Sequence, residues 1–419
     1  MDGQTETAAG GRQGGRAGPL AGLRVLDLTI AMAGPMCSQR LGEMGADVIK
    51  IEAPGGGGFA RRDRMAGVAR FGDSVCFVTL NRCKRSLVLD LKSEAGRGVL
   101  RRLAEGADVL VQNYRPRVAA KLGIDYATLS AVNPRLVLGS ITGYGEEGPM
   151  RDRPGQDLLL QSFTGLAFNG GTEGGLPRAS PLYMVDVSAS HMLCEGVLAA
   201  LLARGATGRG SEVRVSMMGA IMEMQCQEVT SFLAADAPPR RGRAPQVSIY
   251  QEPPYGLYRC REGVLAIAQA DLAVLAAALG VPELAELKRA RPPQRDAEAV
   301  ARWRDRVVEA VAARLAGDTA EAWDARLAPL GVWCMVAQDY AAFLAHPQAA
   351  TVLTEMEHPL GGRCRTVAPG IRFGRGGEEA PLAPAPAYGA HSREVLREAG
   401  WAEAEIDALV ASGAVLEAP

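Results

Sequence analysis

Basic and polar side chains gather in two short stretches in the first third of the chain. The stretch Asn81–Ser86 (NRCKRS) is followed by Lys92, and Asn113–Pro116 (NYRP) comes directly after the apolar run DVLVQ. If the neighbouring apolar runs are parallel strands, their carboxyl ends share one edge of a sheet. Guanidinium, ammonium and amide donors at that edge would bind phosphate or carboxylate oxygens. The pattern predicts an anion site, although each charge taken singly is typical of a solvated surface.

The turn Thr29–Pro35 lies between a predicted strand and a predicted helix, and a second predicted strand ends in Glu52. This is the layout of a dinucleotide-binding fold, whose acidic residue binds a ribose hydroxyl. The turn holds only Gly34 in place of G-x-G-x-x-G, and the chain contains no G-x-x-x-x-G-K-[ST]. Nicotinamide and flavin sites are therefore disfavoured and a P-loop is excluded. Gly34 and Pro35 are also what a well-capped helix start requires.

Asp186 stands between an apolar run and a predicted helix that begins near Ser188. Taken by itself, such a carboxylate is an N-cap that accepts amide hydrogen bonds from the first helical turn. A helix start also keeps a carboxylate ionised and oriented, so an N-cap is compatible with a chemical role. The four histidines and eight cysteines show no C-x-x-C pair and no metal-ligand spacing, and we expect no metal site.

Alternating strand and helix patterns position these groups. The predicted strands are 23–29, 47–52, 85–91, 108–112 and 136–141, and the helices between them are 35–44, 93–104 and 117–129. Repeated strand–helix–strand units imply parallel pairing with right-handed crossovers. Residues 20–145 are therefore predicted to form a doubly wound α/β domain.

The rest of the chain extends this domain and adds a smaller one. A Gly/Pro-rich stretch, 145–178, precedes a long apolar helix, 187–204, a strand, 211–216, and another helix, 217–233. A linker at 234–244 leads to a hairpin of 256–258 and 264–269 and to helices 272–279 and 297–316. A strand-like piece, 366–373, and a helix from Ser392 complete the prediction. We expect a disordered leader over 1–18, the N-terminal part of the large domain over 19–233, a linker and small domain over 234–330, and over 331–419 a segment that returns to the large domain.

Composition excludes several classes of protein. The 419 residues carry 46 basic and 47 acidic side chains, a net charge of −1, so no global field attracts nucleic acid or anionic lipid. The N-terminus lacks the layout of a signal peptide, and the cysteines are typical of reduced thiols. We expect a cytoplasmic protein that binds neither nucleic acid nor membrane.

Several ordered motifs together resemble the class III CoA-transferases, the CaiB/BaiF family. They include LAGLRVLDLT, GADVIKIE, NRCKRSLVLDLKSEAG, ADVLVQNYRP, NPRLVLGSITGYGEEGP, VDVSASHMLCEGVLAALLAR and the late APAYGAH. The match is dense over 20–218 and looser in the C-terminal segment. The resemblance implies a Rossmann-like large domain built from both chain ends, a smaller α/β domain between them, and an interlocked homodimer.

The resemblance also implies the site. The family nucleophile matches Asp186, and the family's CoA contacts match Met32, Ala33, Ala53, Leu89, Asp90, Lys92, Asn113, Tyr114, Arg115, Lys121, Gln156 and Asp157. Some family members have Gln where Met32 stands and Arg where Ala53 stands, which weakens the expected acyl-pocket hydrogen bond and one phosphate or adenine contact. No tightly bound cofactor is implied, since CoA and acyl-CoA are substrates.

The family contains transferases and α-methylacyl-CoA racemases. The racemases carry His-Asp where this chain has Gln156-Asp157, and racemisation needs two acid/base groups on opposite faces of the α-carbon. Gln156 cannot titrate, so we favour CoA transfer to a carboxylic acid through an aspartyl anhydride and an aspartyl-CoA thioester on Asp186. Backbone amides at Gly170-Gly171 are candidates for stabilising the oxyanion.

The acceptor acid is less determined. Met32, Gln156 and the segment 247–254 offer apolar and amide groups, which favours a bulky or aliphatic monoacid. Arg178 or an arginine of 240–243 would instead bind the distal carboxylate of a diacid. A CoA-binding protein without catalysis is the remaining alternative, which Met32 and Ala53 favour and Asp186 disfavours.

Overall fold

The computed structural model describes residues 17–62, 69–70, 73–235, 237–357, 361–373 and 382–418, so most of the predicted leader lies outside the described residues. The chain divides into a large unit of Met1–Asp157, Met184–Ala220 and Ala350–Pro419 and a small unit of Leu158–Tyr183 and Ile221–Ala349. These borders differ from the predicted ones. Residues 158–183 and 221–233, expected in the large domain, and 331–349, expected in the returning segment, belong to the small unit.

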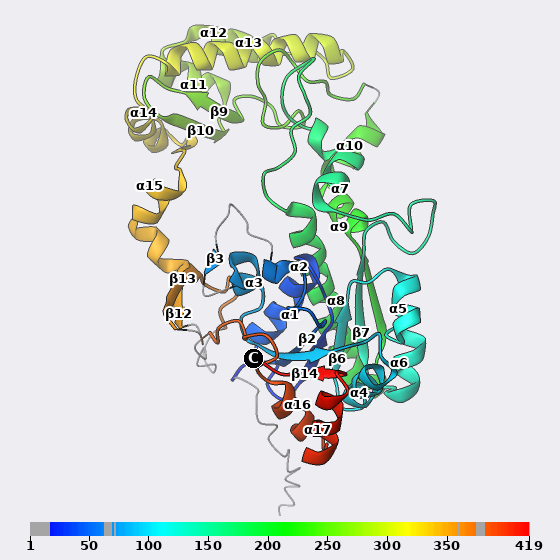
Figure 1. Ribbon diagram of the computed structural model, residues 1–419. Helices are drawn as coiled ribbons and strands as arrows, with labels where there is room; N and C mark the ends of the chain where they lie inside the picture. The colour runs from blue at the N-terminus through cyan, green and yellow to red at the C-terminus, as the bar shows by residue number, and fades with distance from the viewer. Residues whose placement is uncertain are drawn as a thin grey trace, which may run out of the picture. The chain divides into compact units, whose positions relative to one another are not determined.

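A seven-stranded sheet in the order β14-β5-β2-β1-β6-β7-β8 forms the large unit (Figure 1). The strands are β1 (Arg24–Asp27), β2 (Asp47–Glu52), β5 (Lys84–Leu89), β6 (Val109–Gln112), β7 (Val137–Thr142), β8 (Glu212–Ser216) and β14 (Val415–Leu416). All neighbouring pairs are parallel except β14 with β5. The α/β class with a mainly parallel sheet is confirmed. Because β1 has β2 on one side and β6 on the other, the strand order reverses between β1 and β6.

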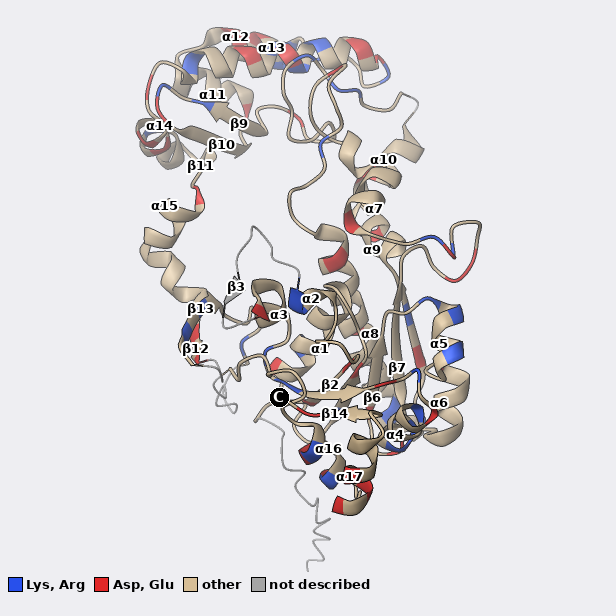
Figure 2. Cartoon of the chain, in the orientation of Figure 1, with Lys and Arg blue, Asp and Glu red and all other residues tan. Residues whose placement is uncertain are grey.

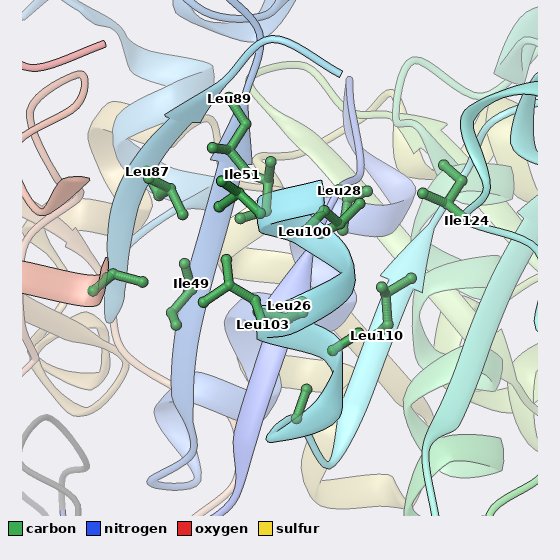
Figure 3. Close-up of a cluster of buried hydrophobic side chains, with 14 of the residues drawn as sticks. Leu26, Leu28, Ile49, Ile51, Leu87, Leu89, Leu100, Leu103, Leu110 and Ile124 are labelled. Carbon is green, nitrogen blue, oxygen red and sulfur yellow. The ribbon is translucent and has the colours of Figure 1, made fainter. Parts of the chain in front are cut away.

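Helices cover this sheet on both faces, which explains why its strands are near-continuous apolar runs. The helices of the large unit are α1 (Ala33–Glu43), α2 (Phe59–Arg62), α3 (Val75–Leu80), α4 (Glu94–Glu105), α5 (Pro116–Leu122), α6 (Tyr126–Val132), α8 (Met184–Thr207), α16 (Ser392–Glu398) and α17 (Glu403–Ala411). Two small hairpins accompany them, β3 (Ala69–Arg70) with β4 (Asp73–Ser74) and β12 (Leu353–Glu357) with β13 (Arg363–Val367). Figure 3 shows Leu100 and Leu103 of α4 packed over strand residues such as Leu26 and Ile49, which are fully buried.

Four predicted elements differ in the structure. The helix predicted over 117–129 is two helices, α5 and α6, because Gly123 takes the left-handed conformation (φ 69°) and ends α5. The helix predicted over 217–233 is also two, α9 (Met217–Met224) and α10 (Cys226–Ala234), separated at Gln225. The Gly/Pro-rich stretch contains an unpredicted helix, α7 (Asp157–Phe163), and the strand predicted over 366–373 is β13, which lies earlier.

The small unit has its own core and its own sheet. The antiparallel strands are β9 (Gly256–Arg259), β10 (Val264–Gln269) and β11 (Trp333–Val336), and the other helices are α11 (Leu272–Leu279), α12 (Pro282–Arg289), α13 (Ala297–Leu315), α14 (Ala320–Leu327) and α15 (Tyr340–Ala345). Trp303 and Trp323 are buried against one face of this sheet, where Tyr258 and Leu265 lie. The predicted hairpin is therefore correct, whereas α12 and α14 were not predicted.

The long helix α8 is apolar enough in length and composition to cross a membrane. In the structure it contacts α1, β7 and β8 with buried residues such as Val185, Leu193 and Val197. Gly139 of β7 and Gly196 of α8 permit this contact, since a Cβ on Gly196 would lie 2.5 Å from a methyl of Val213. Packing inside an α/β domain accounts for the apolar residues on this face, while others, such as Leu202, are exposed.

The C-terminal segment joins the sheet at its edge. Strand β14 pairs with β5, and Glu398 of α16 accepts hydrogen bonds from Arg24 at 2.8 Å and from Arg85 at 2.8 and 2.9 Å. Both arginines also bond Asp47. The network links strands near the start of the chain to a helix more than 300 residues later. Figure 2 shows that α16 and α17 carry charged residues of both signs.

Candidate active site

The segment that follows β1 lies at the point where the strand order reverses, which is where doubly wound sheets bind their ligands. Asn113, directly after β6, holds this segment with two hydrogen bonds to the backbone of Ile30, 2.9 Å to its N–H and 2.8 Å to its carbonyl. Ala31 has a positive φ of 63°, a strained conformation for a residue with a Cβ. The turn after β1 is thus held from the neighbouring strand end.

The first turn of α1 approaches Thr29 so closely that only glycine fits at position 34. A Cβ on Gly34 would lie 2.3 Å from Cβ of Thr29. Pro35 lies in the first turn of α1, where no amide hydrogen is needed. These two residues bring the N-terminus of α1 back against the end of β1, as the sequence predicted for a helix start.

Asp186 lies within the first turn of α8, and its carboxylate accepts a hydrogen bond from the backbone amide of Ala33, the first residue of α1. The N-cap role expected for Asp186 belongs to Asp157 instead. Oδ2 of the buried Asp157 accepts hydrogen bonds from the amides of Val185 at 2.8 Å and Asp186 at 3.1 Å. With its own amide capped by Asp157, Asp186 is left with its carboxylate directed at the N-terminus of another helix.

Burial above all, together with the negative charge of Asp157, raises the pKa of Asp186 to about 6, against the opposing effect of the hydrogen bond from Ala33. A carboxyl group with a pKa near 6 is roughly ten parts ionised to one part protonated at pH 7. It is then both a nucleophilic carboxylate and more basic than an ordinary aspartate. Perturbed carboxyl groups of this kind are typical of active sites.

Several other predicted residues surround a cleft of about 50 Å³ at the carboxyl edge of the sheet. Ala53 and Tyr114 line it, together with Thr29, Ile30 and Ala31 of the turn after β1. Burial raises the pKa of Tyr114. The predicted basic residues Lys92, Arg115 and Lys121 are exposed, and Figure 2 shows basic residues along α5.

Four other predicted contact residues have surroundings that differ from those of an open CoA site. The side chain of Leu89 is 1% exposed in the core, so only its backbone faces the sheet edge. Asp90 accepts the amide hydrogen of Lys92 and so holds its own turn. Met32 is the half-buried N-cap residue of α1, next to the Ala33 amide, and Gln156 is exposed beside Asp157.

The expected oxyanion role of Gly171 is wrong. Its amide donates to the carbonyl of Gln246 at 2.9 Å, and its carbonyl accepts from the Gln246 amide at 3.3 Å. An amide committed to a backbone pair cannot also stabilise an oxyanion. Gly170 has a packing reason instead, because a Cβ there would lie 2.8 Å from the carbonyl oxygen of Val247.

Glu52 stands where a dinucleotide-binding protein would bind ribose, and its carboxylate is fully engaged. Arg61 donates to both carboxylate oxygens, at 2.7 and 2.8 Å, and the hydroxyl of Ser86 donates at 2.6 Å. This agrees with the turn sequence, which argued against a nicotinamide or flavin site. In the part of the chain that the structure describes, no three His, Cys, Asp or Glu side chains gather as metal ligands.

Sequence reasoning missed a buried charge cluster under the turn. Asp27 accepts hydrogen bonds from Lys84 at 2.9 Å and from Lys50 at 3.4 Å, and all three residues are buried. A signal was present, since Asp27 interrupts LRVLDLT and Lys50 interrupts DVIKIE. Charges inside buried strands need partners, but their spacing in sequence does not show which ones.

The chain is similar in sequence and in structure to several known proteins. The model of CoA-transferase family III matches residues 20–392. Succinyl-CoA:glutarate CoA-transferase of Mus musculus is 28% identical over 403 residues, which are 95% of this chain and 90% of that protein. The beta subunit of succinyl-CoA–L-malate CoA-transferase of Chloroflexus aurantiacus is 36% identical over 292 residues, 68% of each chain. The crystal structure of a CaiB/BaiF family protein from Brucella suis matches with a TM-score of 0.75 at 27% identity, covering 92% of this chain and 100% of that one.

Proposed function

The chain belongs to CoA-transferase family III and is a CoA-transferase, and from this premise we propose that Asp186 is the covalent nucleophile that carries CoA from an acyl-CoA donor to a free carboxylic acid. One observation supports this assignment above all. The Asp186 carboxylate is half-buried, accepts a hydrogen bond from the first amide of α1 and has its pKa raised to about 6 by burial. Such a group is ionised at neutral pH and has no cation paired with it among the described residues.

The first half of the proposed reaction releases the donor acid. A carboxylate oxygen of Asp186 attacks the thioester carbonyl of the donor, and the C–S bond breaks to give an aspartyl acyl anhydride and CoA thiolate. The thiolate then attacks the aspartyl carbonyl, which frees the donor carboxylate and leaves an aspartyl-CoA thioester. Both steps pass through an oxyanion that hydrogen-bond donors stabilise. The Ala33 amide, already directed at the carboxylate, is the donor that we assign to this role in place of Gly171.

The second half repeats these steps with the acceptor. Its carboxylate attacks the aspartyl-CoA thioester and expels CoA thiolate, which then attacks the acceptor carbonyl of the new anhydride. The product is the acceptor acyl-CoA, and the Asp186 carboxylate is regenerated. No atoms are gained or lost across the cycle, and no redox partner or hydrolytic water takes part.

We assign the CoA moiety to the carboxyl edge of the sheet. Ala53 and Tyr114 border the cleft there. The exposed Lys92 and Arg115 follow the ends of β5 and β6, and the exposed Lys121 lies in the last turn of α5. Cations at the strand ends suit the phosphates of CoA. Ala53 supplies no cation of its own, and its carbonyl accepts a hydrogen bond from Tyr388 at 2.9 Å.

We also propose that the protein acts as a homodimer of interlocked chains. An exposed apolar face on the small sheet supports this. Leu257 of β9 and Met335 of β11 both pair with Ala266 of β10, the strand between them, so the three residues share one face of the sheet. Leu257 is 62% exposed, Met335 is 71% exposed, and Trp333 of the same sheet is 67% exposed. Large apolar side chains that share a sheet face in this way are typical of protein interfaces.

Two classes of acceptor acid remain open to the test. Met32, an apolar residue next to the Ala33 amide, favours a bulky or aliphatic monoacid. Two of the relatives are named for glutarate and L-malate, which are diacids. A panel of free acids must therefore contain both classes, and a clear preference for diacids would reverse the preference for monoacids.

The decisive experiment follows acyl-CoA products by mass spectrometry. The purified protein is incubated with several acyl-CoA donors and the acid panel, and intact-protein mass spectrometry detects CoA bound covalently. We expect exchange and a CoA adduct with the native chain and neither with Asp186→Asn. Asp407→Asn, which alters an exposed carboxylate on α17, is the matched control and should retain both.

Other outcomes are equally informative. Full acyl exchange by a folded Asp186→Asn protein would refute the covalent mechanism. Uptake of solvent deuterium at the α-carbon of a 2-methylacyl-CoA, without exchange, would identify a racemase in spite of Gln156. Binding of CoA without any turnover would identify a non-catalytic CoA-binding protein.

A further inference from the structure

A fully buried carboxylate lies at the end of the central strand, directly behind the turn that carries Ala33. Both oxygens of Asp27 are occupied. Oδ1 accepts from the amide of Thr29 at 2.8 Å, from the Thr29 hydroxyl at 2.5 Å and from Lys50 at 3.4 Å. Oδ2 accepts from the hydroxyl of Ser38 at 2.6 Å and from Lys84 at 2.9 Å.

These contacts hold both ends of the segment in which Ala33 lies. Thr29 begins the turn after β1, and Ser38 lies in the second turn of α1. The two lysines reinforce the same segment, because Lys50 also donates to the carbonyl of Thr29 and Lys84 donates to the carbonyl of Pro35 at 2.9 Å. One carboxylate thus connects β1, β2, β5 and α1 through side chains that all meet the backbone from Thr29 to Ser38.

Burying the three charged groups of this cluster costs desolvation free energy. Two ammonium groups share one carboxylate, so the cluster has a net charge of +1 when all three are ionised, and all three side chains are buried. Burial lowers the pKa of Lys84 to about 8; the negative charge of Asp27 opposes this shift, and repulsion from Lys50 adds to it. Apolar side chains at such positions are often as stable as a buried ion pair. What this cluster provides beyond stability is a fixed backbone conformation, including the strained Ala31.

We propose that Asp27 is a positioning residue for the reaction: it holds the segment Thr29–Ser38 so that the Ala33 amide stays directed at the Asp186 carboxylate. The proposal rests on the proposed function, since it takes Asp186 as the nucleophile. Asp27 itself touches no reacting atom in this scheme. Its effect on the reaction passes through the backbone of the turn.

This role has a consequence that a merely structural role lacks. The Ala33 hydrogen bond favours the ionised form of Asp186, so a loosened turn raises the pKa at which the nucleophile loses its proton. The charge facing Asp186 comes from Asp157 on α7. Of the other charged groups on α1 and α8, Arg40, Glu43, His191 and Glu195 act on one another and on Cys194, and Arg204 binds Asp108. Loosening the turn should therefore move the acid limb of the pH–rate profile to higher pH.

The test removes two hydroxyl donors without changing any charge. In the double variant Thr29→Val, Ser38→Ala, we expect kcat at pH 7 to fall about tenfold, the acid limb to move up by at least half a pH unit, and KM for the acyl-CoA to change less than threefold. Amide hydrogen exchange over residues 29–38 should become faster. Thr29→Ser, which keeps the hydroxyl, should restore most of the loss when it replaces Thr29→Val.

A buried serine of the same sheet is the matched control. Ser140 of β7 is 2% exposed, and within the described chain its hydroxyl has no hydrogen-bond partner. Ser140→Ala should leave kcat, the acid limb and the exchange of 29–38 unchanged. The charge-removing variant Asp27→Asn is informative only where it folds, and the double variant keeps the test valid where it does not.

Each outcome decides the proposal. Faster exchange at 29–38 with an unchanged kcat and acid limb would overturn it, because the cluster would then hold the turn without serving the reaction. An effect equal to that of Ser140→Ala, or one confined to KM, would overturn it as well. Failure of the proposed function is distinguishable, since it is read in Asp186→Asn: exchange retained there removes Asp186 as nucleophile whatever the double variant does.

Discussion

Burial and the neighbouring charge of Asp157 raise the pKa of Asp186 to about 6, above the ordinary value of 3.8 for an aspartate. A carboxyl group with a raised pKa in the folded state is stabilising only while it is protonated. Its contribution is fully present below the unfolded pKa and is lost as the pH rises through the folded value. At neutral pH the ionised Asp186 therefore lowers the free energy of unfolding, as functional residues often do.

Replacement of this residue should stabilise the protein while it abolishes exchange. We expect Asp186→Asn to increase the free energy of unfolding at pH 7 by about 1–3 kcal/mol, from a shift of roughly two pKa units at about 1.4 kcal/mol each. Urea denaturation at pH 7 and pH 4 measures it. The gain should shrink towards pH 4, where the native carboxyl group is protonated in the folded state. An equal gain at both pH values would show that titration of Asp186 is not its source.

At the scale of elements, the site depends on two helix N-termini that meet at one carboxylate. The first turn of α8 presents Asp186, and α1 presents the Ala33 amide. The position of α1 depends on Gly34, since the helix start and the end of β1 are in direct contact there. Thr29 is held in this position, because its amide and its hydroxyl both donate hydrogen bonds to Asp27.

A methyl group at this contact should displace the helix start. We expect Gly34→Ala to lower the free energy of unfolding by about 1–3 kcal/mol, as overpacking does, and to reduce kcat more than it raises KM. Gly98→Ala on α4 is the control, since a Cβ there meets nothing within 4 Å and a helical Gly→Ala change is favourable by about 0.5–1 kcal/mol. Chemical denaturation and steady-state kinetics of both variants test it. A Gly34→Ala protein as stable and active as the native one would show that α1 moves without consequence.

The elements themselves were largely predictable. The six parallel strands of the large sheet, β1, β2, β5, β6, β7 and β8, follow from short apolar runs bounded by turn residues, and the alternation with helices implied a parallel sheet. The errors lie where a single residue outweighs the pattern. Gly123 ends α5 by adopting a left-handed conformation in an otherwise helical stretch, and α7 is concealed in a Gly/Pro-rich segment. Helix breaks of this kind depend on one backbone conformation and leave the surrounding periodicity intact.

At the scale of the whole molecule, the chain ends meet in the large unit. Glu398 of α16 binds Arg24 of β1 and Arg85 of β5, and the C-terminal strand β14 extends the sheet beside β5. The partners are more than 300 residues apart in sequence. The sheet that carries the site is therefore complete only when the last part of the chain has folded onto it.

Breaking this network should destabilise the large unit as a whole. We expect Glu398→Gln to lower the free energy of unfolding by about 2–4 kcal/mol, because it leaves two largely buried arginines with less compensation. Glu403→Gln removes exposed ion pairs with Arg393 and Arg397 and should have no measurable effect. Urea denaturation followed by circular dichroism compares the two. Equal stability of both variants would show that the C-terminal segment is held by its apolar contacts alone.

The sequence by itself determined the α/β class, most of the sheet and, through ordered family motifs, the family and the candidate nucleophile Asp186. These follow from local apolar periods and from short motifs that need no knowledge of distant contacts. Only the tertiary structure decided that Asp157 caps α8, that the Gly171 amide is committed to Gln246, and that Asp27, Lys50 and Lys84 form one cluster under the turn. The physical reason is that a polar group is defined by its partner, and each of these partners lies between 20 and 80 residues away along the chain. Folding brings these partners into contact, and no local sequence pattern shows which residues will pair.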